Sequence, residues 1–125
     1  MQKIFDKILS IKNKYNSSIV FDTRNLKKND IFIGIKTQKN DGSLFYKDAV
    51  KKKAELILIN NPKVNHQNIF QINNIDNFIL NFCKYLLSQY KGKIIAITGS
   101  VGKTTIKENI YNILKKNNFL VSKSY

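Results

Sequence analysis

The residues best suited to chemistry form one short turn that combines glycines, a lysine and hydroxyl side chains: Gly99, Ser100, Val101, Gly102, Lys103, Thr104 and Thr105. Glycines let the backbone turn sharply and point successive N–H groups inward, where they can hold an anion. Lys103 adds a mobile positive charge, and the hydroxyl of Thr104 is of the kind that binds Mg²⁺ beside a phosphate. The turn is therefore predicted to bind the phosphates of a nucleoside triphosphate.

The sequence on either side of this turn predicts the elements that position it. Residues 93–98 are a run rich in β-branched side chains, which predicts a strand, and apolar residues from Ile106 to residue 116 recur at helical spacing. Ile97 stands where the longer phosphate-loop pattern has glycine, so the match is to the shorter form Gly-x-x-Gly-Lys-Thr. The alternative is an ordinary strand-to-helix turn with a solvated lysine. A helix start that directly follows the turn favours the phosphate loop.

A second candidate site centres on the only arginine of the chain, Arg24, which follows a predicted strand at residues 18–22 and lies beside Thr23. A guanidinium group can bind a phosphate or a carboxylate through two parallel hydrogen bonds, which lysine cannot do. The alternative is a structural ion pair with a neighbouring acid such as Asp30. The loop at residues 39–42, which contains Asn40 and Asp41, also follows a predicted strand.

The remaining elements are predicted from hydrophobic periodicity, with helices at residues 4–14, 44–53 and 75–90 and strands at 31–35, 56–59 and 68–72. Gly34 inside a strand predicts the close approach of a ligand or of another backbone. Ser43 is expected to cap the helix that follows it, and Gly92 to end the helix of residues 75–90. The apolar stripe of that helix and its cysteine, Cys83, are expected in the core.

These elements predict an α/β fold in two parts. Residues 1–91 form a small, complete α/β domain, and residues 92–125 supply the first strand, the P-loop and the helix of a parallel-sheet ATPase domain. A second strand of that domain is expected to begin at residues 119–121. A parallel nucleotide-binding sheet needs several βα repeats, and no later strand supplies the acidic residue that normally holds Mg²⁺. The chain is therefore expected to be the front of a longer enzyme.

Composition limits the possible classes of protein. The formal net charge is +14, yet all but one of the 22 basic residues are lysines scattered along the chain, whereas base readout favours arginine. A solvated basic surface is therefore expected, with no specific nucleic-acid partner. One cysteine cannot form an internal disulfide. Charges at Lys3, Asp6, Lys7 and Lys12 interrupt the N-terminal stretch, so we expect no signal peptide or membrane span and a cytoplasmic protein.

Four stretches resemble the N-terminal and central-domain motifs of the Mur ligases: Asp22-Thr23-Arg24, residues 26–33, Asp41-Gly42 and residues 97–108. The last motif, Gly-Ser-Val-Gly-Lys-Thr-Thr-x-Lys-Glu, is most similar to the members that add D-alanyl-D-alanine to UDP-N-acetylmuramoyl tripeptide. The members that add the third residue of the stem peptide are the near alternative. Two positions depart from the family, because Ser43 stands where histidine is common and Asn29 where glycine is usual.

The resemblance implies a division of labour between the two parts. The first would bind the UDP end of the substrate through Thr23, Arg24, Asn40 and Asp41. The second would bind ATP and Mg²⁺, with the backbone of residues 99–105 around the phosphates, Lys103 as the catalytic residue on the terminal phosphates and Thr104 on the metal. In such ligases a peptide carboxylate attacks the γ-phosphate to form an acyl phosphate, which the amine of the incoming dipeptide displaces.

The resemblance therefore predicts part of an ATP-dependent amide ligase of peptidoglycan synthesis. Its substrates would be UDP-N-acetylmuramoyl peptide and D-alanyl-D-alanine, without a membrane partner, and it would be a monomer. This part of the enzyme is expected to be inactive alone. The alternative is that the chain is not part of an enzyme but a non-catalytic module that binds a UDP nucleotide or a polyanion.

Overall fold

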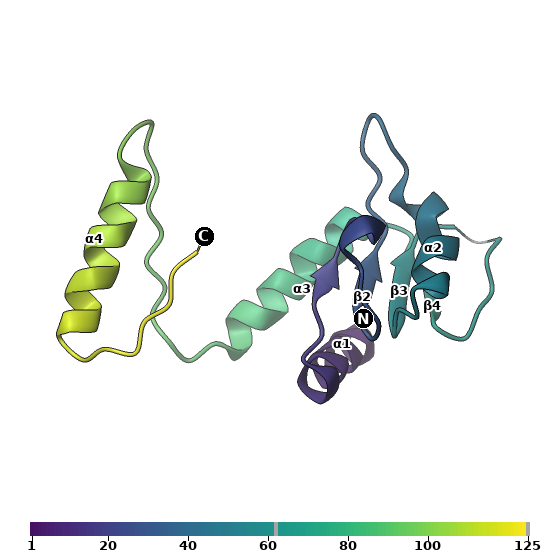
Figure 1. The fold of residues 1–125 in the computed structure, drawn as a ribbon, viewed down its shortest axis with the longest axis horizontal. Helices are drawn as coiled ribbons and strands as arrows, with labels where there is room; N and C mark the ends of the chain where they lie inside the picture. Colours follow the sequence, from purple (N-terminus) through teal and green to yellow (C-terminus); the bar gives the residue numbers. More distant parts are fainter. Residues whose placement is uncertain (62, 125) are drawn as a thin grey trace. The chain divides into compact units, whose positions relative to one another are not determined.

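The structure is a computed structural model that describes residues 1–61 and 63–124. It divides into two units, Met1–Tyr90 and Lys91–Tyr125, which are described separately (Figure 1).

The first unit is built on a parallel sheet of four strands, β1 (Ile19–Val20), β2 (Ile31–Ile33), β3 (Leu56–Ile59) and β4 (Ile69–Gln71), which lie side by side in that order. In the register, Ile31 lies opposite Ile19 on one side and Leu56 on the other, and Ile57 lies opposite Ile69. The α/β class predicted from the sequence is confirmed, although β1, β2 and β4 are shorter than predicted. Because all four strands run in the same direction, their carboxyl ends lie along one edge of the sheet.

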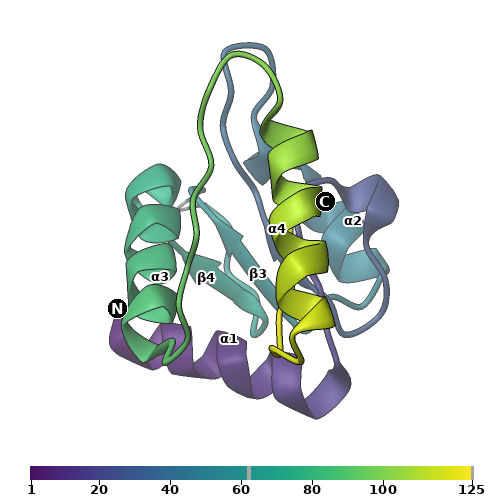
Figure 2. The same ribbon diagram turned by 90° about the vertical axis from the view of Figure 1, so that its left-hand side faces the viewer.

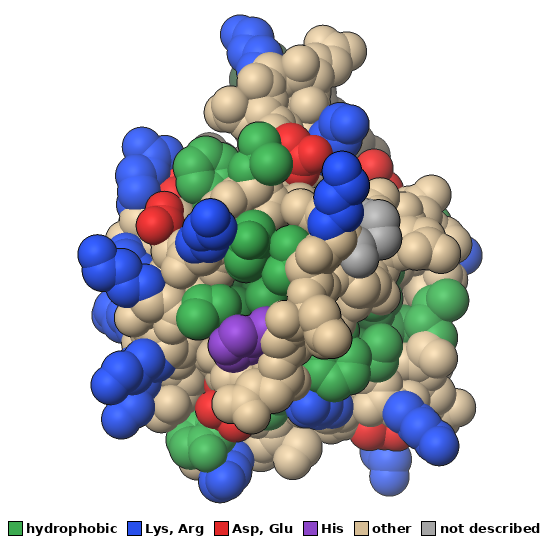
Figure 3. All heavy atoms as spheres, turned by 90° about the vertical axis from the view of Figure 1, so that its right-hand side faces the viewer, with side chains coloured by type: hydrophobic (Ala, Val, Ile, Leu, Met, Phe, Trp, Pro, Cys, Tyr) green, Lys and Arg blue, Asp and Glu red, His purple; other side chains and the backbone are tan. Residues whose placement is uncertain are grey.

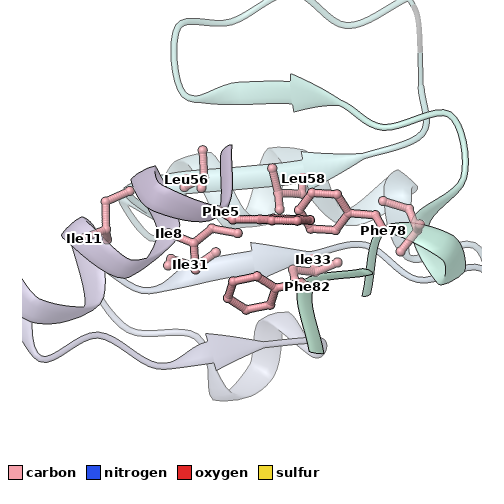
Figure 4. Packing of buried hydrophobic residues seen from close by; sticks show 10 residues of the cluster. Phe5, Ile8, Ile11, Ile31, Ile33, Leu56, Leu58, Phe78 and Phe82 are labelled. Carbon is pink, nitrogen blue, oxygen red and sulfur yellow. The ribbon is translucent and has the colours of Figure 1, made fainter. Parts of the chain in front are cut away.

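Helices cover both faces of this sheet. Figure 2 shows α1 (Gln2–Tyr15) and α3 (Ile75–Gln89) on the same face, where they pack against alternate strand residues in a core of Phe5, Ile8, Ile11, Ile31, Ile33, Leu56, Leu58, Ile75, Phe78 and Phe82 (Figure 4). The other face is covered by α2 (Tyr46–Lys51), with a core of Leu26, Phe32, Ala49, Ala54, Ile57 and Ile59. A sheet that is covered on both faces needs continuous apolar strands, as the sequence of β3 provides.

Aromatic rings join α1 to α3. The ring of Phe5 lies with its centroid 5.3 Å from the centroids of Phe78, Phe82 and Tyr85. The hydroxyl of Tyr85 donates a hydrogen bond to Asp6 Oδ1 at 2.6 Å. The spacing of apolar residues at three and four positions in both helices brings these rings to the same side.

The second half of α3 differs from the prediction. Ile75, Phe78 and Phe82 are buried, but Leu86, Leu87 and Tyr90 of the same apolar stripe are exposed, and Cys83 is exposed as well. For Leu86, Leu87 and Tyr90 the reason is length, because the 15 residues of α3 rise about 22 Å, whereas a four-residue strand spans about 13 Å. Cys83 is exposed for another reason, since it lies on the solvent side of a turn whose Phe82 and Tyr85 pack against the core. The helix also ends at Gln89, with Tyr90 in an extended conformation, so Gly92 is not its stop signal.

Two glycines allow the chain after β2 to fold back on itself, so that the backbone at residues 34–35 lies against the backbone at residues 42–43. A Cβ atom on Gly34 would lie 2.9 Å from the backbone of Gly42 and Ser43, and one on Gly42 would lie 2.6 Å from the carbonyl oxygen of Ile35. The structure thus confirms the prediction for Gly34, with another backbone as its close neighbour. Asn29, where the family usually has glycine, takes a φ of 68°, a left-handed conformation that asparagine tolerates.

Ser43 does not cap the helix as predicted. The α-helix α2 begins after Phe45 without a side-chain cap. Asp41 caps the 3-10 helix η2 (Gly42–Phe45) that precedes α2, because its carboxylate accepts a hydrogen bond from the Ser43 N–H at 2.9 Å. The hydroxyl of Ser43 accepts from the N–H of Asn60 at 3.2 Å, which ties the start of η2 to the end of β3. The side chain that accepts at an N-terminus is the one that precedes the helix, and here that position belongs to Asp41.

The second unit contains α4 (Lys103–Lys116), and no strand is assigned to its described residues, 91–124. The prediction of strands at residues 93–98 and 119–121 is therefore wrong. A segment becomes a strand only when its backbone pairs with a neighbouring backbone, however apolar its sequence is. No residue of α4 is buried, and Ile94, Ile95, Ile113 and Phe119 are exposed. None of the described helices is long and apolar enough to cross a membrane.

Candidate functional site

The residues predicted to form a phosphate loop lie at the N-terminus of α4. Gly102 takes the N-cap position with a φ of 79°, and Gly99 has a φ of 146°, both in the region that favours glycine. The helix begins with a hydrogen bond from the Ile106 N–H to the Gly102 carbonyl oxygen at 2.9 Å. The N–H groups of Lys103, Thr104 and Thr105 have no acceptor within the helix, and no side chain caps this end. Such an end attracts a negatively charged group.

The side chain of Lys103 folds back over this loop, and its Nζ donates a hydrogen bond to the carbonyl oxygen of Gly99. Beside it lies a hollow of about 220 Å³, lined by Ile95, Ile97, Lys103, Thr104, Lys107 and Ser124. Lys107 is engaged there, since its Nζ donates to the Ser124 carbonyl oxygen at 2.7 Å. Ser100, Val101 and Thr105 are exposed and do not line the hollow. The structure thus places Lys103 and Thr104 together at the helix start.

This arrangement fits a phosphate group better than it fits a metal ion by itself. Thr104 offers one hydroxyl oxygen, and among the described residues no carboxylate lines the hollow. Across residues 1–61 and 63–124, no group of three or more His, Cys, Asp or Glu side chains is placed to hold a metal. Mg²⁺ bound here would therefore need further oxygen ligands, which nucleotide phosphates supply.

A cavity of about 250 Å³ opens in the first unit at the carboxyl ends of β2, β3 and β4, where parallel α/β sheets usually bind ligands. Asn60, Asn73 and Asn74 of this cavity were not predicted as site residues, because they belong to asparagine pairs that match no motif. Their common signal is position, since they follow the ends of strands. The cavity is lined by Gly34, Lys36, Asp41, Ser43, Asn60, Asn73, Asn74, Ile75 and Asp76.

Of the four residues predicted for the UDP end, Asp41 alone lines this cavity. Asn40 lies next to it in an exposed turn, in which the Thr37 N–H donates to the Asn40 carbonyl oxygen at 2.7 Å. Thr23 is buried in the 3-10 helix η1 (Thr23–Asn25) that follows β1, and its carbonyl oxygen accepts from Lys52 Nζ at 2.6 Å. Arg24 of the same helix points into solvent, with 88% of its side chain exposed. The four residues therefore do not meet in one cavity.

Arg24 is paired with an acid other than the one predicted. Its Nη2 lies 2.5 Å from Asp22 Oδ2, and its Nε lies 3.0 Å from both carboxylate oxygens. Asp30 accepts instead from the backbone N–H groups of Ser18 and Lys27, each at 2.9 Å. The hydrogen bonds from Arg24, side chain first and backbone second, lower the pKa of Asp22 to about 2. Asp22 therefore holds the guanidinium in place beside η1.

Removing this guanidinium is expected to raise the pKa of Asp22 from about 2 toward its usual value. A carboxyl group whose pKa is lowered by folding stabilises the fold above its ordinary pKa, and that contribution is lost as the pH falls toward 2. The Arg24→Gln variant should therefore show a higher titration midpoint for the carboxyl carbon of Asp22 by NMR. The Lys28→Gln variant is the control, and a midpoint that stays low in Arg24→Gln would contradict the assigned cause.

The comparison with curated proteins finds relatives with two names. Over 116 residues, the chain is 33% identical to the UDP-N-acetylmuramoyl-tripeptide–D-alanyl-D-alanine ligase of Rickettsia prowazekii, an alignment that covers 90% of this chain and 25% of the relative. Over 122 residues, it is 38% identical to the UDP-N-acetylmuramoyl-L-alanyl-D-glutamate–2,6-diaminopimelate ligase of Buchnera aphidicola from Schizaphis graminum, covering 86% and 24%. The chain thus spans about a quarter of the length of these relatives. No family model matches it.

Solved structures give the same result at the level of the fold. The MurF ligase of Thermotoga maritima, solved in complex with ADP, matches with a TM-score of 0.70 and 29% identity over 80% of this chain and 23% of that structure. A MurF structure from Acinetobacter baumannii matches with a TM-score of 0.71 at 21% identity, over 87% of this chain and 27% of that structure, which supports the fold alone.

Proposed function

We propose that this chain, which belongs to the Mur ligase family, carries the N-terminal part of an ATP-dependent ligase that joins D-alanyl-D-alanine to UDP-N-acetylmuramoyl tripeptide. The observation that carries the proposal is the loop at the start of α4, where Gly102 in a left-handed conformation, uncapped N–H groups and Lys103 converge. A loop of this kind suits the phosphates of ATP. The solved relative from Thermotoga maritima holds ADP, which supports a nucleotide here.

In this proposal the second unit binds ATP and Mg²⁺. The backbone of residues 99–105 surrounds the phosphates, and Lys103 exchanges its hydrogen bond to Gly99 for one to a terminal phosphate oxygen. Thr104 would hold Mg²⁺ through its hydroxyl oxygen, and the metal would supply positive charge beside the phosphate that is transferred. Lys103 also lowers the barrier to transfer, because its ammonium group stabilises the negative charge that develops on the phosphate oxygens.

The first unit, in the same proposal, binds the UDP end of the substrate along the carboxyl edge of its sheet. Asp41 contributes from the cavity and Asn40 from the adjoining turn, while Thr23 and Arg24 contribute from η1. Arg24 can turn from Asp22 to a phosphate, because its side chain is exposed and a diphosphate carries more charge than one carboxylate.

A second candidate is the related ligase that adds the third residue of the stem peptide. It is favoured by the 38% identity to the 2,6-diaminopimelate ligase from Buchnera. The names of the two groups of relatives contain different UDP-linked peptide substrates, a tripeptide and L-alanyl-D-glutamate. Calorimetric titration of the chain with the UDP-N-acetylmuramoyl forms of both peptides distinguishes the candidates, and tighter binding of the tripeptide form supports the first. Failure to bind either form would contradict both.

The Arg24→Lys substitution is expected to weaken binding of UDP-N-acetylmuramoyl tripeptide by about 1–3 kcal/mol, the contribution of a hydrogen bond to a charged group. Lysine keeps the charge but loses the two-pronged geometry. Calorimetry measures the change, with Lys28→Arg as a control that should retain the original affinity. If Arg24→Lys binds as tightly as the unchanged chain, Arg24 serves only its ion pair with Asp22.

Ligation by the 125-residue chain alone is expected to be undetectable. Such catalysis needs the carboxylate, the γ-phosphate and the amine held in one geometry, and this positioning supplies several kcal/mol of the lowered barrier. The assay is phosphate release with UDP-N-acetylmuramoyl tripeptide, ATP, Mg²⁺ and D-alanyl-D-alanine, beside the Lys103→Ala variant. Turnover that needs every substrate and disappears in this variant would overturn the expectation.

A further inference from the structure

A groove of about 480 Å³ in the first unit lies apart from both candidate sites, between α2 and residues 63–66 of the connection from β3 to β4. Four apolar side chains in it are only partly buried against the core of that face, namely Tyr46, Val50, Val64 and Ile69. Each one therefore contacts the core on one side and leaves apolar surface accessible in the groove. Covering this surface would be favourable, because apolar area gains free energy when it leaves water.

The rim of this groove is positively charged. Lys47 and Lys51 lie four residues apart and therefore on one side of α2, and Lys63 lies on the opposite wall. The ion pairs found in the described residues involve none of these three lysines. None of the described residues that line the groove is an Asp or Glu, and Asp48 of α2 lies outside the lining. Figure 3 shows this face, with apolar side chains beside the single histidine and lysines around them.

The wall that faces α2 is held by hydrogen bonds to β4. The side chain of Gln71 donates to the Val64 carbonyl oxygen at 2.8 Å and accepts from the Asn61 N–H at 3.0 Å. The Val64 N–H donates to the Asn61 carbonyl oxygen at 3.1 Å. A wall that is already ordered lowers the entropy cost of binding.

We propose that this groove binds a segment of a partner protein in which an apolar side chain is flanked by aspartate or glutamate. The apolar side chain would cover the surface between Tyr46 and Ile69, and the flanking carboxylates would meet the three lysines. A small molecule fits less well, because the groove is open along one face and leaves much of a small ligand in water. Single-stranded nucleic acid fits less well too, because Val50, Val64 and Ile69 are aliphatic and offer bases no stacking surface, unlike Tyr46 and His66.

The test is fluorescence anisotropy with the full chain and a labelled synthetic peptide that carries one phenylalanine between glutamates. The double variant Lys47→Glu/Lys51→Glu is expected to weaken binding about tenfold or more, because two attractions become repulsions. The matched control is Lys3→Glu/Lys84→Glu, which changes the net charge equally on α1 and α3, on the other face of the sheet. It should bind within about twofold of the unchanged chain, because solvent screens distant charges.

Two further peptides separate the apolar and charged contributions. Replacing phenylalanine with serine, or every glutamate with lysine, should weaken binding at least as much as the double variant. Lys63→Glu, in a loop, repeats the charge reversal if the helix substitutions unfold the protein. Absence of binding by the acidic peptide, equal loss in the control variant, or tighter binding of a single-stranded RNA that displaces the peptide would each overturn the proposal.

Discussion

Replacing Phe5 with alanine is expected to destabilise the first unit by about 3–5 kcal/mol, the usual cost of removing a large aromatic side chain from a core. Phe5 is 5% exposed, and its ring contacts Phe78, Phe82 and Tyr85 of α3. Alanine would remove the ring that joins the two helices and leave a cavity between them. Since domains of this size are stable by only about 5–13 kcal/mol, the variant should lose a large part of its stability.

Urea unfolding, followed through NMR signals of the first unit, measures this loss. Phe21→Ala is the matched control, because Phe21 is 45% exposed and should cost about 1 kcal/mol or less. Equal losses in the two variants would mean that the contacts of Phe5 do not hold α1 on the sheet. Phe5→Leu, which keeps more of the apolar volume, should lie between them.

Hydrogen exchange is expected to differ about a thousandfold or more between the two units of this chain. Backbone amides of β2 and β3 are enclosed on both faces of the sheet and should exchange only when the first unit opens as a whole. Amides of α4 should exchange quickly, because no residue of this helix is buried. Helices of this length are marginal in water unless an apolar face is packed against other elements.

The chain contains its own control for this measurement. Helices α1 and α4 each have 14 residues and both end in a lysine-rich turn, but α1 buries Phe5, Ile8 and Ile11. If helix propensity alone determined protection against hydrogen exchange, the backbone amides of the two helices would exchange at similar rates. Slow exchange in α1 with fast exchange in α4 supports packing as the cause, and equally slow exchange in both helices of a monomer would contradict it. The experiment also shows whether MgATP slows exchange at Gly102 and Lys103, as a phosphate bound there should.

Short-range patterns in the sequence were enough to determine much of this protein. Apolar periodicity located α1, α3 and β3, because one buried face imposes the same spacing wherever the helix or strand packs. The turn at Gly99 and Gly102 was recognisable because the backbone angles it needs are open mainly to glycine. The family motifs were likewise contained in short stretches of the chain, and relatives with Mur ligase names support that resemblance.

Only the tertiary structure decided which residues meet. The partner of Arg24 is Asp22 rather than Asp30, and Asp30 instead accepts hydrogen bonds from two backbone N–H groups. Asn60, Asn73 and Asn74 share a cavity with Asp41 because parallel strands bring their carboxyl ends to one edge, which no local pattern reveals. Cys83 is exposed because it lies on the solvent side of α3, in a turn whose Phe82 and Tyr85 pack against the core. The apolar run at residues 93–98 forms no strand, since a strand depends on hydrogen bonds to a neighbouring backbone and sequence periodicity does not specify that neighbour.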